Sequence, residues 1–362
     1  MAEKIILYAG TYTRPSPYLE ATNGKGIYVY EFDVQSGKLS FASVTEHIDC
    51  PSYLAIDPKK QHLYATSEVW LWPEGRLTAF EIDPDSGALQ YLNVQPTGGS
   101  ITAYVSVDQT DRLALLVNYW SGSVAAFPLS DDGRLKPYRT FIQHVGTGPN
   151  PERQEGPHPH LIVADPTNRY AIVPDLGMDK VLVYAIDVEA QQLSPAPVSE
   201  LALESGSGPR HFEFHPNGQY AYVIKELNST ISALAWDSAN GRFELLQTVP
   251  ALPSDFDGIS HCADLHITPD GRFVYGSNRG HDSLVIYRID ADTGKLDYVG
   301  HQSTLGRTPR SFTIDPTGAY VLVANQDSDN VVVFRIDPNT GLLHETSVVD
   351  VPTPACLKMI AL

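Results

Sequence analysis

Cysteine is scarce in this chain of 362 residues, which contains Cys50, Cys262 and Cys356 and no others. The three are odd in number, lie far apart and form no C-x-x-C pair, which favours reduced thiols over a disulfide framework or a cysteine zinc site. We expect reduced thiols that pack as small apolar side chains.

Basic residues are also outnumbered, with 25 Lys and Arg against 43 Asp and Glu and a net charge of −18. Such a charge repels nucleic acid and anionic membranes, so neither is expected as a partner. The chain has no apolar run long enough to span a bilayer, and MAEKIILYAGTYT lacks the features of a secretory signal. These absences predict a cytoplasmic protein.

Several familiar catalytic motifs are missing. The sequence has no G-x-S-x-G elbow, no H-E-x-x-H, no phosphate loop and no G-x-G-x-x-G after a strand. It offers no signature of a serine hydrolase of that type, a zinc peptidase or a nucleotide-binding enzyme, and we expect no cofactor.

Internal repeats are what the sequence does contain. A turn followed by an apolar run recurs at intervals of 47 to 57 residues, starting at Asp57, Asp108, Asp165, His215, Thr268 and Asp315. A second element follows each copy, as in GRLTAFEIDPDSGAL, and GIYVYEFDVQSGKL from Gly26 is a seventh copy of it. A period of this length is typical of propellers and solenoids.

The two ends of the chain complement each other. KIILYAGTYT, near the start, resembles the second half of the first element, and TPACLKMIAL, at the end, supplies the missing front half. Pairing these ends in one blade would remove free sheet edges. The sequence therefore predicts an all-β, seven-bladed β-propeller with four-stranded antiparallel blades, forming a single domain over residues 1–362.

The connections between strands are of two kinds. Compact Asp/Pro/Gly turns join adjacent strands and should all lie on one face. The opposite face should receive the long connections, which are residues 14–26, 69–75, 146–159 and 252–262. Long, uneven loops on a rigid scaffold commonly carry function, so the face with these loops is the candidate active face.

Two positions in each repeat should reach that face near the axis. Five residues before the start of the turn stand Ser52, Ala103, His160, Arg210, Ala263 and Arg310, and eleven after it stand Glu68, Tyr119, Leu176, Glu226, Arg279 and Gln326. A purely structural propeller would fill such positions with small or hydroxylated side chains. The charged residues from consecutive blades instead predict a basic pocket that binds an anion.

His160, in GPHPHL, is the candidate general base, because histidine can take up a proton near neutral pH. The neighbouring His158 is a candidate substrate contact. Both residues could alternatively be structural histidines that bond loop carbonyls.

Arg210 and Arg279 carry the permanent charge and fork geometry that suit a carboxylate, a phosphate or a developing oxyanion. The alternative is an ion pair between blades. Glu226 could position Arg210, orient a water molecule or act as an acid, or it could form a plain Arg–Glu pair. His211, Asp264, His266 and His281 are weaker candidates, because alternation along a strand turns neighbours to opposite faces.

A site for a divalent metal ion is an alternative to the anion-binding pocket. Glu68, Asn118, Asp175 and Asn325 could imitate the channel ligands of metal-dependent propellers. Arginines in the same funnel would repel a divalent cation, so we expect no metal.

The linked motifs GPHPHL, GPRH, SNRGHDS and VANQDS resemble those of the lactonase family of seven-bladed propellers. That family includes the propeller-type 6-phosphogluconolactonases and is related to the fungal carboxymuconate-lactonising enzyme. The resemblance covers essentially the whole chain and implies metal-independent opening or closing of a lactone. It also implies functional roles for His160, Arg210, Glu226 and Arg279. One departure is Cys262 in HCADLH, where a small residue or proline would be expected, and it puts only local packing in doubt.

The resulting hypothesis is hydrolysis of 6-phospho-D-glucono-1,5-lactone. His160 activates water, Arg210 and Arg279 stabilise the oxyanion, and Arg310 with His158 engages the phosphate. His211, Asp264 and Asn278 are further substrate contacts.

Two alternatives remain open: a lactonase or cycloisomerase for another anionic organic acid, and a non-catalytic interaction module. The one hint of an interaction module is the apolar VWLWP at 69–73. A closed propeller buries its edges, so a monomer is expected.

Overall fold

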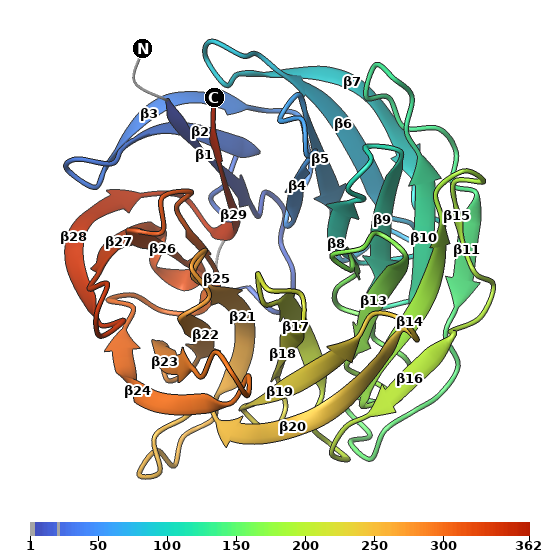
Figure 1. Cartoon of the computed structure of the whole chain (residues 1–362). Helices are drawn as coiled ribbons and strands as arrows, with labels where there is room; N and C mark the ends of the chain where they lie inside the picture. Colours follow the sequence, from blue (N-terminus) through green and yellow to red (C-terminus); the bar gives the residue numbers. More distant parts are fainter. Residues whose placement is uncertain (1–3, 20–21) are drawn as a thin grey trace. The chain divides into compact units, whose positions relative to one another are not determined.

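The computed structural model describes residues 4–19 and 22–362 of the chain (Figure 1). In this part of the chain, antiparallel strands form seven sheets, and the one helix is a single 3-10 turn, Gln326–Ser328. The fold is therefore the seven-bladed β-propeller that the repeats predicted. No helix among the described residues could cross a membrane.

The chain divides into two compact units. One comprises the chain up to His47, His211–Trp236 and Glu244–Leu362, and the other comprises Ile48–Arg210 and Asp237–Phe243. We call them the terminal unit and the central unit. The single domain over residues 1–362 stays a prediction, and residues 1–3, together with residues 20–21 of the first long loop, lie outside the described residues.

Three sheets lie in the central unit. Their strands are β4 (Leu54–Ile56), β5 (His62–Ser67), β6 (Arg76–Ile82) and β7 (Leu89–Pro96); β8 (Thr102–Val107), β9 (Leu113–Asn118), β10 (Ser123–Pro128) and β11 (Thr140–Gln143); and β12 (Val163–Ala164), β13 (Tyr170–Asp175), β14 (Lys180–Asp187), β15 (Gln192–Leu193) and β16 (Ser199–Ala202). In the last sheet both β15 and β16 pair with β14.

The other sheets follow the same order. Their strands are β17 (Pro209–Phe214), β18 (Tyr220–Lys225), β19 (Thr230–Asp237) and β20 (Arg242–Pro250); β21 (His261–Ile267), β22 (Phe273–Arg279), β23 (Ser283–Ile289) and β24 (Leu296–Ser303); β25 (Pro309–Ile314), β26 (Tyr320–Asn325), β27 (Asn330–Ile336) and β28 (Leu343–Asp350); and β29 (Pro354–Ala361), β1 (Ile5–Thr11), β2 (Ile27–Asp33) and β3 (Lys38–Thr45).

The predicted pairing of the chain ends is confirmed. Strand β29 runs antiparallel to β1, with Ile5 opposite Ala361 and Ala9 opposite Leu357, and the two strands lie side by side in Figure 1. Both edges of β1 are thereby occupied, by β29 and by β2, which leaves β1 no free edge for another chain.

The repeated Asp-Pro turns are held by their first residue. Oδ1 of Asp165 accepts the backbone N–H groups of Arg169 and Tyr170, each at 2.8 Å, and Oδ2 accepts the Thr167 hydroxyl at 2.6 Å. Asn168 takes a positive φ of 57°, which asparagine tolerates better than most residues. A side-chain acceptor at this position thus closes each β-hairpin and fixes the register of the two inner strands.

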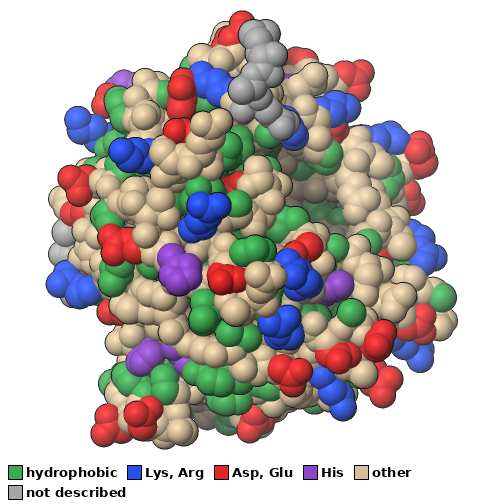
Figure 2. All heavy atoms as spheres, turned by 60° about the vertical axis from the view of Figure 1, so that its left-hand side comes forward, with side chains coloured by type: hydrophobic (Ala, Val, Ile, Leu, Met, Phe, Trp, Pro, Cys, Tyr) green, Lys and Arg blue, Asp and Glu red, His purple; other side chains and the backbone are tan. Residues whose placement is uncertain are grey.

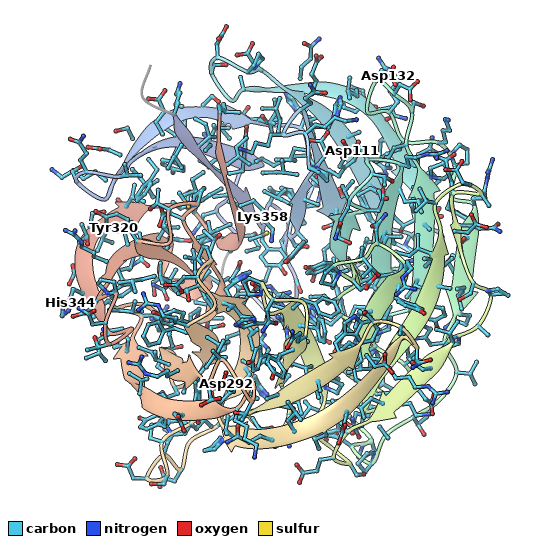
Figure 3. All side chains as sticks on the ribbon, in the orientation of Figure 1. Asp111, Asp132, Asp292, Tyr320, His344 and Lys358 are labelled. Carbon is cyan, nitrogen blue, oxygen red and sulfur yellow. The ribbon has the colours of Figure 1, made fainter. Side chains whose placement is uncertain are left out.

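Buried tyrosines connect neighbouring sheets of the terminal unit. The hydroxyl of Tyr275 donates to the Gly341 carbonyl at 2.8 Å, and that of Tyr320, labelled in Figure 3, donates to the Val34 carbonyl at 3.0 Å. Between β1, β29, β26 and β27 lies a core that contains Leu7, Leu322, Val333 and Leu357. Because side chains alternate along a strand, Leu322 enters this core, whereas the neighbouring Val321 and Val323 enter the core on the opposite face of the same sheet.

The distribution of charged side chains on the surface and the state of the cysteines are both as the composition indicated. Acidic and basic side chains are interspersed on the face shown in Figure 2. Cys50, Cys262 and Cys356 are all buried and none forms a disulfide, as predicted from their spacing.

Candidate active site

The predicted register places the candidate residues at the ends of strands. Glu226 directly follows β18, Arg279 is the last residue of β22, and Tyr119 directly follows β9. Arg210 is the second residue of β17 and is only 2% exposed. These four residues therefore lie at strand ends, as the count along each repeat predicted.

His160 lies in the central unit on a segment held by its backbone. Its N–H donates to the Pro174 carbonyl at 3.2 Å, and Pro159 forms an isolated β-bridge with Asp175. The side chain is largely buried, and its ring meets the ring of Tyr119 at 5.3 Å in an edge-on arrangement. Bonds within the protein thus hold the backbone of the candidate base, and its ring packs against Tyr119.

Asp175 anchors the His158–His160 segment. Its Oδ1 accepts the N–H groups of His158 at 2.8 Å and Gly177 at 3.0 Å, and its Oδ2 lies 2.7 Å from Nδ1 of His144. The hydroxyl of Tyr184 lies 2.9 Å from the other ring nitrogen of His144. Burial raises the pKa of Tyr184, so its hydroxyl stays protonated and can donate. The sequence had offered Asp175 as a metal ligand, but its oxygens serve this network.

Asp179, four residues later in the same turn, holds the segment that leads to Arg210. Its Oδ2 accepts the N–H of Gly206 at 2.6 Å, and its Oδ1 accepts the N–H of Gly208 and the side-chain amide of Gln154, each at 2.8 Å. Gly208 has a φ of 62°, a backbone conformation that favours glycine. One turn of the β13–β14 hairpin therefore positions the segments of both His160 and Arg210.

His158 is engaged within the protein. Its Nδ1 lies 3.0 Å from the Tyr119 carbonyl oxygen, and its Nε2 lies 3.1 Å from Oε1 of Glu155. The ring stacks on Tyr119 with centroids 4.7 Å apart. The alternative of a structural histidine that bonds a loop carbonyl describes these contacts, and the phosphate contact assigned to His158 is not supported by them.

Arg279 and Glu226 form an ion pair in the terminal unit. Nη2 of Arg279 lies 2.9 Å from Oε2 of Glu226, and the guanidinium also donates to the carbonyl oxygens of His261 and Cys262, each at 3.2 Å. The sequence offered Glu226 as a partner of Arg210, as a residue that orients water, as an acid or as one member of a plain Arg–Glu pair, and the pair with Arg279 is of this last kind. These bonds fix the plane of the guanidinium while 18% of the side chain stays exposed.

His211 and Asp264 belong to a buried network in the terminal unit. Oδ1 of Asp264 lies 2.7 Å from Nδ1 of His211, and its Oδ2 lies 3.5 Å from Nε2 of His266. Nδ1 of His266 lies 2.8 Å from Glu213. Burial opposes charge on His266, but Asp264 and Glu213 outweigh it and raise the pKa of His266 to about 10. The same histidines hold the pKa of Asp264 well below its usual range, against the effect of burial.

The remaining candidates differ in their surroundings. Asn278 is fully buried, its amide donates to the Ala251 carbonyl at 2.8 Å and to Ser283 at 3.2 Å, and its Oδ1 lies 3.1 Å from Sγ of Cys262. A substrate contact from Asn278 is therefore not supported. Arg310 is half-buried, with its guanidinium carbon 5.5 Å from the centre of the Tyr12 ring.

Two of the residues named as possible metal ligands, Asn118 and Asn325, bond neighbouring segments of the chain. Asn118 accepts a hydrogen bond from Thr102 at 2.7 Å and donates to the Thr97 carbonyl, and Asn325 donates to the Thr304 carbonyl. Within residues 4–19 and 22–362, no group of three or more His, Cys, Asp or Glu side chains is placed to hold a metal ion.

The side chains that hold the His160 and Arg210 segments in position were not among the residues predicted from the sequence. Asp179, His144, Tyr184 and Gln154 lie outside the two rim positions, and their partners come from distant parts of the chain. The aromatic pair Tyr119–Trp120 was visible in the sequence, next to a position that the count had already selected.

The seven sheets define a β-propeller, in which His160 lies on a segment with a bonded backbone, Arg210 is buried and Arg279 is paired with Glu226. A family model described as lactonase, 7-bladed beta-propeller, matches residues 6–359, and the chain belongs to this family.

Named relatives and solved structures agree with this family. A 6-phosphogluconolactonase of Bacillus subtilis is 37% identical over 86% of this chain and 85% of its own length, and one of Formosa agariphila is 36% identical over 85% and 86%. The solved structure of a periplasmic gluconolactonase of Pseudomonas aeruginosa is 34% identical, covers 99% of both chains and has a TM-score of 0.91.

Proposed function

We propose that this chain hydrolyses 6-phospho-D-glucono-1,5-lactone to 6-phosphogluconate, a step of the pentose phosphate pathway. The family and the names of the relatives support this reaction. The observation that carries it is His160, a largely buried histidine on a segment whose backbone is fixed by Pro174 and Asp175. A general base must be held in line with the attacking water, and this segment provides that rigidity.

In the proposed mechanism, His160 takes a proton from water as the water oxygen attacks C1 of the lactone. The negative charge that develops on the former carbonyl oxygen is assigned to Arg210 and Arg279. The C1–O5 bond then breaks, His160 returns the proton to O5, and the carboxylic acid product loses its own proton to solvent. Each proton is accounted for without a further reactant.

The Glu226–Arg279 pair keeps the Arg279 guanidinium in one orientation, so Glu226 is proposed as a positioning residue. Arg310 is assigned to the phosphate, because its charge is permanent and it is only half-buried. His211 and Asp264 are proposed to support the strands they join, because Oδ1 of Asp264 lies 2.7 Å from Nδ1 of His211 and its Oδ2 accepts the backbone N–H of Phe312 at 3.2 Å.

We further propose that the reaction needs no metal ion, that it takes place in the cytoplasm and that the active form is a monomer. Polarisation of the carbonyl by arginine would replace the role of a Lewis acid. The acidic chain, with its net charge of −18, is not suited to anionic membranes or nucleic acid.

The test is a coupled assay in which glucose-6-phosphate dehydrogenase generates the phospholactone and its disappearance is followed with and without the protein. We expect clear acceleration over spontaneous hydrolysis. No acceleration of this lactone would contradict the proposal. Acceleration of unphosphorylated glucono-1,5-lactone alone, the substrate type suggested by the name of the Pseudomonas aeruginosa protein, would move the assignment to a neutral lactone.

A further inference from the structure

An exposed aromatic cluster in the central unit has no role in the mechanism above. The rings of Trp70 and Trp120 meet edge to face with centroids 5.2 Å apart. Trp120 is 48% exposed, and the neighbouring Leu71 is 84% exposed. We call Trp70 and Trp120 the tryptophan pair.

The pair comes from two separate connections of the fold. Trp70 lies in the loop between β5 and β6, and Trp120 lies in the tight turn between β9 and β10, which the Gly122 N–H closes on the Asn118 carbonyl at 3.0 Å. A side chain in so short a turn cannot enter the blade core. The Trp120 ring is thereby left 48% exposed at the surface, where its apolar face can contact a ligand.

The cluster continues to the candidate base through adjoining rings. The Trp120 ring lies 6.1 Å from that of His158, which stacks on Tyr119 at 4.7 Å, and Tyr119 meets His160 at 5.3 Å. Glu155, which contacts His158, is also exposed at this edge. The tryptophan pair is therefore the solvent-exposed end of a chain of contacting rings that leads through the buried His158 and through Tyr119 to the largely buried His160.

We infer that Trp120, supported by Trp70, is the platform on which the apolar C–H face of the lactone ring binds while the reaction proceeds at His160. An aromatic face carries partial negative charge and attracts the weakly positive C–H groups of a sugar ring. The ring hydroxyls then point to the sides, where Glu155 offers a carboxylate acceptor. This assignment rests on the proposed function and names Trp120 as a specificity-determining residue for sugar lactones.

The test compares Trp120→Ala, Trp120→Phe and Trp70→Ala with the wild type on the phospholactone. We expect Trp120→Ala to raise KM by about five- to tenfold with kcat nearly unchanged, because a stacking contact is worth about 1 kcal/mol. Trp120→Phe keeps an aromatic face and should stay within about twofold of the wild type. Trp70→Ala, which removes the support, should raise KM by a smaller factor.

Intrinsic fluorescence provides a second readout that does not depend on turnover. The stable product 6-phosphogluconate should change the emission of the wild type, and Trp120→Phe should abolish most of that change. The matched control is Trp236→Phe, which alters a buried tryptophan, 7% exposed and packed on Phe214, and should keep the response.

The deciding quantity is KM of the folded Trp120→Ala variant. A value within twofold of the wild type, or a loss confined to kcat, overturns the platform whatever the fluorescence shows. If the wild type itself does not accelerate phospholactone hydrolysis, the proposed function fails first. The two failures are thus told apart by the activity of the wild type.

Discussion

Nη2 of Arg279 lies 2.9 Å from Oε2 of Glu226, and both side chains are largely withdrawn from solvent. The same guanidinium is bonded to the carbonyl oxygens of His261 and Cys262, so two kinds of acceptor fix its plane. An arginine held in this way stabilises a developing charge without first having to reorganise.

Substitution of Arg279 tests whether the fixed orientation of its guanidinium contributes to kcat/KM. Arg279→Lys keeps the charge but cannot bond Glu226 and two carbonyls in the same planar geometry. We expect kcat/KM to fall by about 100-fold or more, in the range found when an oxyanion donor is removed. The kcat/KM of Glu226→Gln should fall less, because the amide oxygen can still accept a hydrogen bond from the Arg279 guanidinium. Equal activity of Arg279→Lys and wild type would rule out the oxyanion role.

His160→Ala tests the general base. Loss of a positioned base typically costs a factor of about 100 to 10,000, so we expect kcat/KM to drop by that amount on the phospholactone. Thermal unfolding should stay close to that of the wild type, because the backbone bond to Pro174 is kept. His344→Ala is the control, since His344, labelled in Figure 3, is an exposed residue of β28. Retained activity in a folded His160→Ala variant would contradict the mechanism.

The His266 network should make stability depend on pH. The pKa of His266 is raised to about 10 in the folded protein, above its value of about 6.5 in an unfolded chain. Its contribution is therefore complete below about pH 6.5 and is lost as the pH rises through 10. Urea denaturation at pH 6, 8 and 10 should show the difference between wild type and His266→Gln shrinking toward pH 10. His344→Gln should show no such trend, and a difference that is constant over this range would argue against a charged His266.

We expect Asp264 to contribute to the stability of the fold and to affect catalysis only indirectly. Asp264→Asn leaves His211 and His266 facing a neutral amide in a buried place, and breaking such a pair costs about 3 kcal/mol or more. We expect a lower denaturation midpoint, and a KM for the phospholactone near that of the wild type in the folded fraction. A large rise in KM without loss of stability would restore Asp264 as a substrate contact.

Chelation tests the absence of a metal requirement. Extended dialysis against EDTA should leave kcat/KM within about 20% of its starting value, because a charge on arginine is not removed by chelators. Loss of activity that returns on adding a divalent cation would contradict this expectation and would point to a cation bound by carboxylate and carbonyl oxygens.

The internal repeats alone predict the architecture of the fold. The spacing of the turns from Asp57 to Asp315 predicted seven blades, and the complementary ends predicted the pairing of β1 with β29. This was possible because each blade is set by local features: alternating apolar residues, and a side chain such as Asp165 that closes its own hairpin. The same count along each repeat located Glu226 and Arg279 at strand ends.

Tertiary structure alone decided which side chains face one another. His211 and Asp264 are 53 residues apart and bond at 2.7 Å, and Asp179 holds glycines almost thirty residues away. No periodicity within one repeat encodes such pairs, because they form between blades whose distance along the chain is set by loops. The sequence by itself thus determined the number of blades and the strand ends, whereas the packing of one blade on the next decided the contacts of His158 with Tyr119, of Asn278 with Ala251 and of Glu226 with Arg279.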